Sequence, residues 1–494
     1  MHNQLNPFET VSGSNKLGSP IYTLLVLGIT AFLSFLIAKS GLMVGIGLII
    51  LPFILVYVYL LFKFPILGLY TAISLGFLIL GLSRYIKGLP LGMAMDGILI
   101  LTFIALIFNR FRGRIDWSPA KRDITLLAAV WFAYSIFQVA NPESRSITAW
   151  LAGMRGISLY MMLIVPLTLL FLNTNKKLDT FLILWGIFSL LASFKGILQN
   201  IIGVDPWEKA WLDGGGAVTH VLFGKLRIFS FLSDAGQFGA NQGYSAVVAL
   251  IVSTVEKNIK RKIFFIVVGV LGLYGMLLSG TRGSISVPLA GFALYFVLRK
   301  NKAVMISGFF LLIVIFAFFK YTTIGQDNQQ IRRIRSAFDP NDASLQVRLE
   351  NQKILKVYLA SRPFGGGIGH AGVKAQKYLP NAFLSNVATD SWYVLIWAEQ
   401  GIVGLLLHLF ILFYVLIKTT FLIWFHLRDP VLKIKIAALA AGMFGVMVAS
   451  YGNAVLGTMP TSMLIYTSMA LMLSSKSLDA EALSSNQTAI KSEI

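Results

Sequence analysis

The sequence contains no cysteine and has few charged residues. Of 494 residues, 13% are charged, and 21 acidic residues stand against 42 basic ones, a formal net charge of +21. The lack of cysteine excludes disulfide frameworks, thiolate metal sites and cysteine nucleophiles. Soluble domains are about 25% charged, so this chain is not an ordinary soluble enzyme. Five scattered histidines and the lack of paired carboxylates predict no metal site and no cofactor.

Long hydrophobic runs dominate the chain instead. Hydrophobic residues make up 56% of it, and the mean hydropathy is +0.75. Runs of about 17–25 apolar residues are typical of helices that span a bilayer. About fourteen such runs predict an all-α, polytopic membrane helical bundle. They lie at about 21–38, 42–61, 64–82, 90–108, 123–140, 156–172, 180–202, 238–254, 263–279, 284–299, 303–319, 391–416, 436–453 and 460–474.

The basic residues predict the orientation of this bundle. Lys and Arg prefer cytoplasmic loops, and five of them lie between the fourth and fifth predicted spans: Arg110, Arg112, Arg114, Lys121 and Arg122. Alternate loops agree, which places both termini in the cytoplasm. Because many basic residues lie in short loops between apolar runs, the net charge does not indicate nucleic-acid binding. We expect a cytoplasmic tail over 1–20, membrane regions over 21–202 and 203–474, and a disordered cytoplasmic tail over 475–494.

Two longer loops fall on the predicted outer side, a medium one at about 203–237 and a large one at about 320–390. Long loops in compact proteins are usually functional or disordered. The large loop has signals of order, since Asp342 can cap a helix over about 343–360 that the glycines at 365–367 would follow. Chemistry is therefore expected in the outer loops.

Two arginines are candidates for binding an anion at the outer surface. Arg282 sits in Ser-Gly-Thr-Arg-Gly-Ser at 279–284, on a turn between two glycines. Its planar guanidinium matches phosphate, although an interfacial arginine also reaches toward lipid headgroups. Arg227 precedes the span at 238–254, whose helix N-terminus attracts anions. A structural ion pair between Arg227 and Asp234 is the alternative.

Other polar residues have both functional and structural interpretations. Arg348, Gln352 and Lys356 are spaced four apart, so one helix face would carry them, as a substrate site or as a solvated surface. Lys195, in the outer half of the seventh span, is a further binding candidate. The basic cluster Arg332, Arg333 and Arg335 is interpreted as surface.

The end of the large loop supplies candidates for proton transfer and sugar binding. His370 follows a glycine-rich stretch that lacks the features of a nucleotide loop. Asp390 opens the span at 391–416, where it is either an N-cap or a general base for an attacking hydroxyl. Trp392 and Tyr393 suit an interfacial belt or stacking on a sugar ring.

Three stretches together resemble the O-antigen ligase and O-antigen polymerase superfamily of membrane glycosyltransferases. They are the Arg227 segment that ends at 234–239, the turn at 281–283, and the tract from Arg348 through 362–369 to Asp390 and 399–404. The resemblance covers about residues 220–415. It implies a C-type (GT-C-like) multi-helical glycosyltransferase fold in the bacterial inner membrane, with the active site on the periplasmic face.

The resemblance also implies a reaction. Such proteins transfer an oligosaccharide from an undecaprenyl-pyrophosphate carrier to an acceptor hydroxyl on a glycan, lipid or protein. It implies that Arg227 and Arg282 bind the pyrophosphate without a metal, and that the base occupies the position of Asp390, where family members usually have histidine; His370 is the alternative base. Polymerase and ligase activities stay equally open. A transporter or flippase of lipid-linked sugar is the competing hypothesis, and a structural scaffold a weaker one.

Overall fold

The computed structural model of this protein describes residues 20–86, 91–113, 115–222, 224–327, 329–336, 339 and 341–492. The predicted N-terminal tail over 1–20, apart from Pro20, lies outside these residues, as does Arg114. The chain divides into two compact units, Met1–Pro65 and Ile66–Ile494. The first holds α1 (Pro20–Ser40) and α2 (Leu42–Lys63), two strongly apolar helices.

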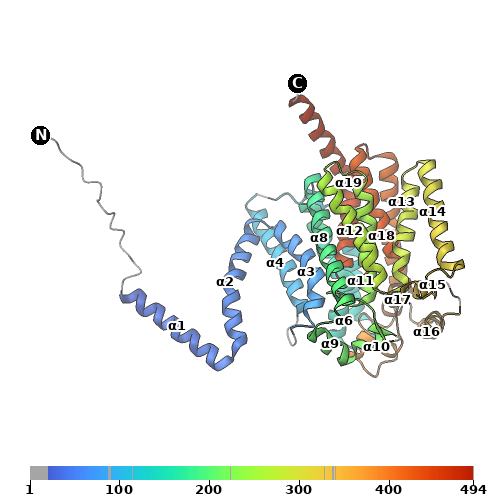
Figure 1. The fold of residues 1–494 in the computed structure, drawn as a ribbon. Helices are drawn as coiled ribbons and strands as arrows, with labels where there is room; N and C mark the ends of the chain where they lie inside the picture. Colours follow the sequence, from blue (N-terminus) through green and yellow to red (C-terminus); the bar gives the residue numbers. More distant parts are fainter. Residues whose placement is uncertain are drawn as a thin grey trace. The chain divides into compact units, whose positions relative to one another are not determined.

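The second unit is a helical bundle with short helices and loops gathered at one end (Figure 1). Its long helices are α3 (Ile66–Leu82), α4 (Leu91–Phe111), α5 (Asp123–Phe137), α6 (Ile147–Met154) with α7 (Tyr160–Phe171), α8 (Asn175–Ile201), α11 (Ala235–Ser253), α12 (Ile259–Leu278), α13 (Ser286–Leu298), α14 (Lys302–Tyr321), α17 (Trp392–Phe425), α18 (Pro430–Ala449) and α19 (Thr461–Ser492). A π-helical turn, Arg155–Leu159, joins α6 to α7.

Shorter elements gather at the end of the bundle opposite the last turns of α19, and we call this the loop end (Figure 1). They are α9 (Pro206–Trp211), a π turn (Leu212–Gly216), α10 (Ala217–His220), strands β1 (Val221–Leu222) and β2 (Lys225–Leu226), α15 (Gln329–Arg335) and α16 (Ala343–Leu359). The two strands pair antiparallel, with Val221 opposite Leu226. Both predicted outer loops are therefore ordered where the structure describes them.

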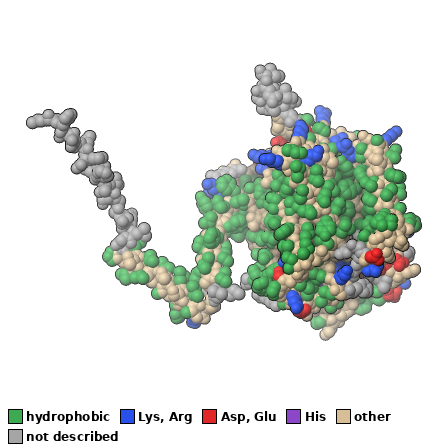
Figure 2. Space-filling model, in the orientation of Figure 1, with side chains coloured by type: hydrophobic (Ala, Val, Ile, Leu, Met, Phe, Trp, Pro, Cys, Tyr) green, Lys and Arg blue, Asp and Glu red, His purple; other side chains and the backbone are tan. Residues whose placement is uncertain are grey.

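The predicted helical membrane bundle is confirmed. Each of the fourteen predicted ranges falls on a helix. Within the described residues, ten helices are long and apolar enough to cross a membrane, and two apolar helices, at 66–82 and 282–298, are shorter. The count of fourteen spans stays a prediction. Figure 2 shows hydrophobic side chains over the helices of the second unit and charged side chains at both ends.

Side-chain caps set the starts of the helices near the loop end. Asp234 caps α11 by accepting from the N–H of Gln237 at 2.9 Å. Asp342 caps α16 through the N–H of Leu345, as the sequence predicts. The predicted N-cap role of Asp390 is wrong. Ser391 caps α17 instead, which leaves the Asp390 carboxylate for a side-chain partner.

Small residues allow the core helices to approach closely. A Cβ on Gly445 of α18 would lie 2.2 Å from the carbonyl oxygen of Val287 in α13, and one on Gly442 would lie 2.4 Å from the ring of Tyr244 in α11. Such contacts drive helix association in membranes, where lipid is as apolar as the side chains. The core they form holds α11, α13 and α18 in fixed positions, and the loop end is built on these helices.

The C-terminal tail is predicted to be disordered over 475–494, but in its described part, up to Ser492, it continues α19. Asp479 accepts hydrogen bonds from the backbone N–H groups of Arg428 and Asp429 at 3.1 and 2.8 Å, and Asn175 donates to the carbonyl of Leu478. These contacts with the start of α18 and α8 hold the polar segment in helical form. The polar composition of this segment does not indicate these hydrogen bonds.

Candidate functional site

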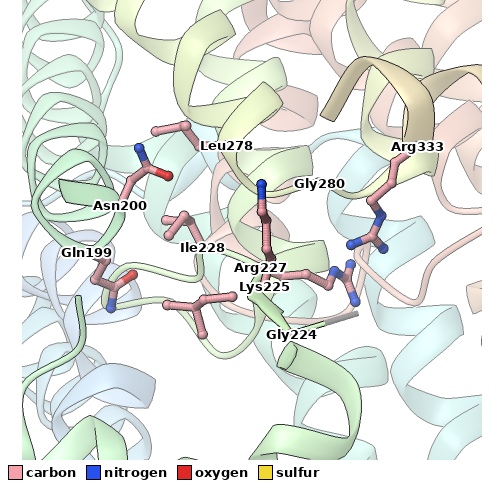
Figure 3. Close-up of a pocket in the computed structure, with 10 residues that line it drawn as sticks. Gln199, Asn200, Gly224, Lys225, Arg227, Ile228, Leu278, Gly280 and Arg333 are labelled. Atoms are coloured by element: carbon pink, nitrogen blue, oxygen red, sulfur yellow. The ribbon is translucent and has the colours of Figure 1, made fainter. Parts of the chain in front are cut away.

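A cavity of about 380 Å³ lies at the loop end, where β2 meets the end of α12. We call it the arginine cavity. Figure 3 shows Arg227 and Arg333 extending their guanidinium groups toward one another from different elements. The other lining residues are Gln199, Asn200, Gly224, Lys225, Leu226, Ile228, Leu278 and Gly280. Three cationic side chains and no acidic one thus line this cavity.

Arg227 is held in place by two hydrogen bonds. Its Nη1 donates to the carbonyl of Thr219 at 2.9 Å, and its Nη2 donates to Oγ1 of Thr281 at 2.8 Å. Thr281 in turn donates to the carbonyl of Ala235, in the first turn of α11. The buried Nε has no hydrogen-bond partner among the described residues. Burial and the nearby charge of Arg282 lower the pKa of Arg227, while Asp234 opposes this shift.

Arg333 lines the same cavity, although its sequence cluster was interpreted as surface. Its guanidinium packs over Gly280, where an added Cβ would lie 3.4 Å from Nη1. Burial, followed by the charges of Arg227 and Arg282, lowers the pKa of Arg333 to about 10, so the group stays charged at neutral pH. Among the described residues no carboxylate pairs with it. Clustered like charges of this kind favour binding of an anion.

Arg282 borders this cluster but does not line the cavity. It forms an ion pair with Asp342, and its Nη1 also donates to Ser336 at 3.1 Å. Asp342 caps α16, so the pair fastens the start of that helix to the turn between α12 and α13. The structure therefore gives Arg282 a contact within the protein that the sequence does not reveal, and places Arg333 at the cavity.

Arg348 and Asp390 form a second charged pair, with Nε and Oδ2 3.3 Å apart. The Asp390 side chain is 54% exposed, so the carboxylate is accessible to a substrate. The turn after α18 lies near both this pair and the turn that carries Arg282: a Cβ on Gly452 would lie 3.9 Å from Nη1 of Arg348, and one on Gly283 would lie 2.2 Å from Nδ2 of Asn453. One turn thus contacts both groups of residues.

His370 has no free ring nitrogen. Nδ1 lies 2.8 Å from the carbonyl of Ile368, and Nε2 accepts from the backbone N–H of Ser146 at 3.2 Å. Burial lowers the pKa of His370, which favours this neutral form. The histidine thus fastens the glycine-rich loop to the start of α6. This geometry favours Asp390 over His370 as a proton acceptor.

Lys195 also has partners within the protein. Its Nζ lies 3.1 Å from Asp205 and 3.2 Å from the buried Glu208, at the start of α9. Trp392 donates to Nε2 of His408 at 2.9 Å, and Tyr393 donates to the carbonyl of Met447 at 2.8 Å. None of the three lines the arginine cavity. Their predicted binding roles stay predictions.

The sequence predicts no metal site, because its five histidines are scattered and it lacks paired carboxylates. Among the described residues, no group of three or more His, Asp or Glu side chains is placed to hold a metal ion. The cationic side chains at the arginine cavity are themselves able to neutralise a phosphate group.

Comparison with known proteins supports the family resemblance. Residues 244–409 match the O-antigen ligase family model. This match supports the O-antigen ligase and O-antigen polymerase superfamily for that region of the chain. It is also 24% identical over 334 residues to an O-antigen polymerase of Salmonella muenchen, an alignment that covers 65% of this chain and 80% of that relative. The resemblance seen in the sequence is thereby confirmed, and neither match favours a transporter.

The superfamily match covers the residues of the large loop but not all of the candidate site. Arg282, Arg333, Arg348 and Asp390 lie within 244–409, whereas Arg227 lies before it. The interpretation of Arg333 as a surface residue is wrong; it was made because a basic helix on a long loop is usually solvated. Its only sequence signal is its place in the loop that contains Asp342, and the contact with Gly280 depends on the tertiary fold.

Proposed function

We propose that this membrane protein of the O-antigen ligase and polymerase superfamily transfers an oligosaccharide from an undecaprenyl-pyrophosphate carrier to an acceptor hydroxyl. The observation that carries the proposal is the arginine cavity, where Arg227 and Arg333 converge without a carboxylate among the lining residues. A pyrophosphate carries several negative charges and planar arrays of acceptor oxygens, which guanidinium groups match.

The proposed reaction breaks one bond and forms one. The acceptor hydroxyl oxygen attacks the anomeric carbon of the donor sugar, the carbon–oxygen bond to pyrophosphate breaks, and the carrier leaves with the electron pair. Arg227 and Arg333 stabilise the charge that develops on the leaving group. The hydroxyl proton passes to the Asp390 carboxylate, which Arg348 holds in place at 3.3 Å. Arginines thereby take the place of a metal.

The proposal places the loop end on the outer face of the bacterial inner membrane, with both termini in the cytoplasm. The bias of Lys and Arg toward alternate short loops supports this orientation. A lipid carrier anchored in the bilayer would then present its headgroup at the depth where α12 ends and α15 begins. Cysteines introduced at exposed Lys353 and Arg332, labelled by a membrane-impermeant reagent in intact spheroplasts, test this orientation.

The decisive test is transfer by the purified protein. The lipid-linked glycan that accumulates in cells lacking this chain serves as donor, and the protein is reconstituted in vesicles with no other enzyme. We expect a new glycosidic bond and free undecaprenyl pyrophosphate, with an undiminished rate in EDTA. Movement of the labelled lipid across the bilayer without a new bond would instead support a transporter. A product that grows by whole repeats indicates a polymerase, and one transfer to a different acceptor indicates a ligase.

A further inference from the structure

A second and larger cavity, of about 620 Å³, lies beside the start of α17. We call it the Trp392 cavity. Small residues of α6 and the following π turn, among them Ala152 and Gly156, form one wall. The loop after the glycine-rich stretch, with Lys374 and Tyr378, forms the other, and Trp392 and Glu399 of α17 also line it. It shares no lining residue with the arginine cavity.

The chemistry of this cavity differs from that of the arginine cavity. Its walls are mainly apolar, but Lys374 and Lys377 line it at one side, and Glu399, which is 3% exposed, brings a carboxyl group. Oε1 accepts weakly from the N–H of Ala371 at 3.4 Å, and Oε2 has no hydrogen-bond partner among the described residues. A buried polar atom without a partner costs free energy, so an occupant that donates hydrogen bonds to it would be favoured.

This combination identifies the class of occupant. A hydrocarbon chain would leave Oε2 without a donor. A sugar has hydroxyl donors for Oε2 and an apolar face for the Trp392 and Tyr378 rings, which lie at the same cavity. The volume is within the range of about 300–1,000 Å³ found for small-molecule sites.

The cavity adjoins the residues of the proposed reaction. Thr389, next to Asp390, lines it, as do Gly457 and Thr458 of the segment between α18 and α19. The carbonyl of Thr458 accepts from Nε2 of Gln237, in the first turn of α11, at 2.7 Å. The same segment contacts Gly283, beside Arg282, through Asn453. One segment therefore forms part of a wall of the Trp392 cavity and also contacts the turn that carries Arg282.

We infer that the Trp392 cavity binds the saccharide of the acceptor, with a sugar hydroxyl donating to Glu399, while the arginine cavity binds the pyrophosphate of the donor. The inference rests on the proposed function and assigns its second substrate a place. A transferase that joins two glycans needs two such sites, and two cavities that share no lining residue keep donor and acceptor apart.

Two probes separate the two sites. The first is the oligosaccharide released from its carrier by mild acid, which has no pyrophosphate; the second is inorganic pyrophosphate. Binding of each is measured by calorimetry on the whole, detergent-solubilised protein. Glu399→Gln replaces Oε2 with an amide nitrogen, which cannot accept a hydrogen bond, and keeps the oxygen that accepts from Ala371. We expect it to weaken oligosaccharide binding by about tenfold or more and to leave pyrophosphate binding unchanged. Arg333→Ala should have the opposite pattern.

Control variants distinguish a binding defect from misfolding. Glu350→Gln makes the same chemical change on the exposed face of α16. Ala152→Leu fills the Trp392 cavity, and Thr148→Leu enlarges an exposed residue on the same helix. Oligosaccharide binding should be lost in Ala152→Leu and kept in both controls, with thermal stability equal in all four. The inference is overturned if the wild type does not bind the oligosaccharide. It is also overturned if Glu399→Gln and Ala152→Leu bind the oligosaccharide as tightly as the wild type does. If the wild type neither binds pyrophosphate nor transfers the glycan, the proposed function is overturned instead.

Discussion

Nη2 of Arg227 donates a hydrogen bond to Oγ1 of Thr281 at 2.8 Å, and this contact joins the medium loop to the turn between α12 and α13. Oγ1 of Thr281 in turn donates a hydrogen bond to the carbonyl of Ala235, in the first turn of α11. The position of one guanidinium group is thus fixed by two helices of the buried core. Such fixed charges stabilise a transition state well, because they do not reorganise during the reaction.

Removal of a cavity arginine should abolish transfer without unfolding the protein. Arg333→Ala is expected to lower the transfer rate by about 10²–10³-fold, as loss of one stabilising donor does in other enzymes. Arg332→Ala, the neighbouring exposed arginine on α15, is the matched control and should keep its rate. Equal rates for both variants in the reconstituted assay would remove Arg333 from the site. Arg227→Ala should resemble Arg333→Ala.

The proton acceptor is tested by two variants side by side. Asp390→Asn keeps the shape of the side chain and loses the base, so kcat should fall by about 10²–10⁴-fold with little change in thermal stability. His370→Ala removes the two hydrogen bonds to Ile368 and Ser146 and should lower stability more than kcat at permissive temperature. If His370→Ala loses its turnover while its melting temperature is unchanged, the base is misassigned.

Lys195 should prove structural. Lys195→Ala leaves the buried Glu208 without its cation, which is expected to cost about 1–3 kcal/mol of stability. The substrate concentration that gives half-maximal transfer should not change. A melting curve and a donor titration on the same purified variant decide the matter, and a raised KM with normal stability would support a direct substrate contact. Lys209→Ala, an exposed lysine on α9, is the control.

Acidification should destabilise the medium loop through His220. Nε2 accepts from the N–H of Ala235, and burial lowers the pKa of His220 below the usual value of about 6.5. The unfolded chain then binds a proton that the folded chain does not, so stability falls as pH drops through about 6.5 and stays constant well above it. Melting temperatures at pH 8 and pH 5.5 should differ less in His220→Asn than in the wild type. Identical differences would contradict this account.

The glycine-rich loop should not tolerate side chains. Gly365 has φ +77°, and a Cβ there would lie 2.3 Å from the backbone nitrogen of Gly401, where α17 is kinked. Backbone strain alone costs about 1–3 kcal/mol. Gly365→Ala should destabilise the protein by more than this, because the added Cβ also clashes with Gly401. Gly214→Ala, where no atom lies within 4 Å of an added Cβ, should have nearly normal stability. Expression level and melting temperature of the two variants test this comparison.

The resemblance to the superfamily and the cap at Asp342 were available from the sequence, because both depend on local patterns of residues. The caps illustrate the limit of such patterns. Asp342 caps α16 as the sequence predicts. Of the two interpretations left open for Asp390, the N-cap is wrong, since Ser391 sits one residue later and competes for the same backbone N–H groups. Local rules do not decide between adjacent capping residues when a distant partner such as Arg348 attracts one of them.

Hydrophobic runs alone determined that this protein is a helical membrane bundle, because the cost of unpaired backbone groups in lipid allows few alternatives. The tertiary structure decided which charges meet. It paired Arg282 with Asp342 and Lys195 with Asp205 and Glu208, and it brought Arg333 over Gly280 beside Arg227. These partners are far apart in the chain or lie on separate elements, and no periodicity records such contacts, since they arise only when the core helices fix where each loop begins and ends.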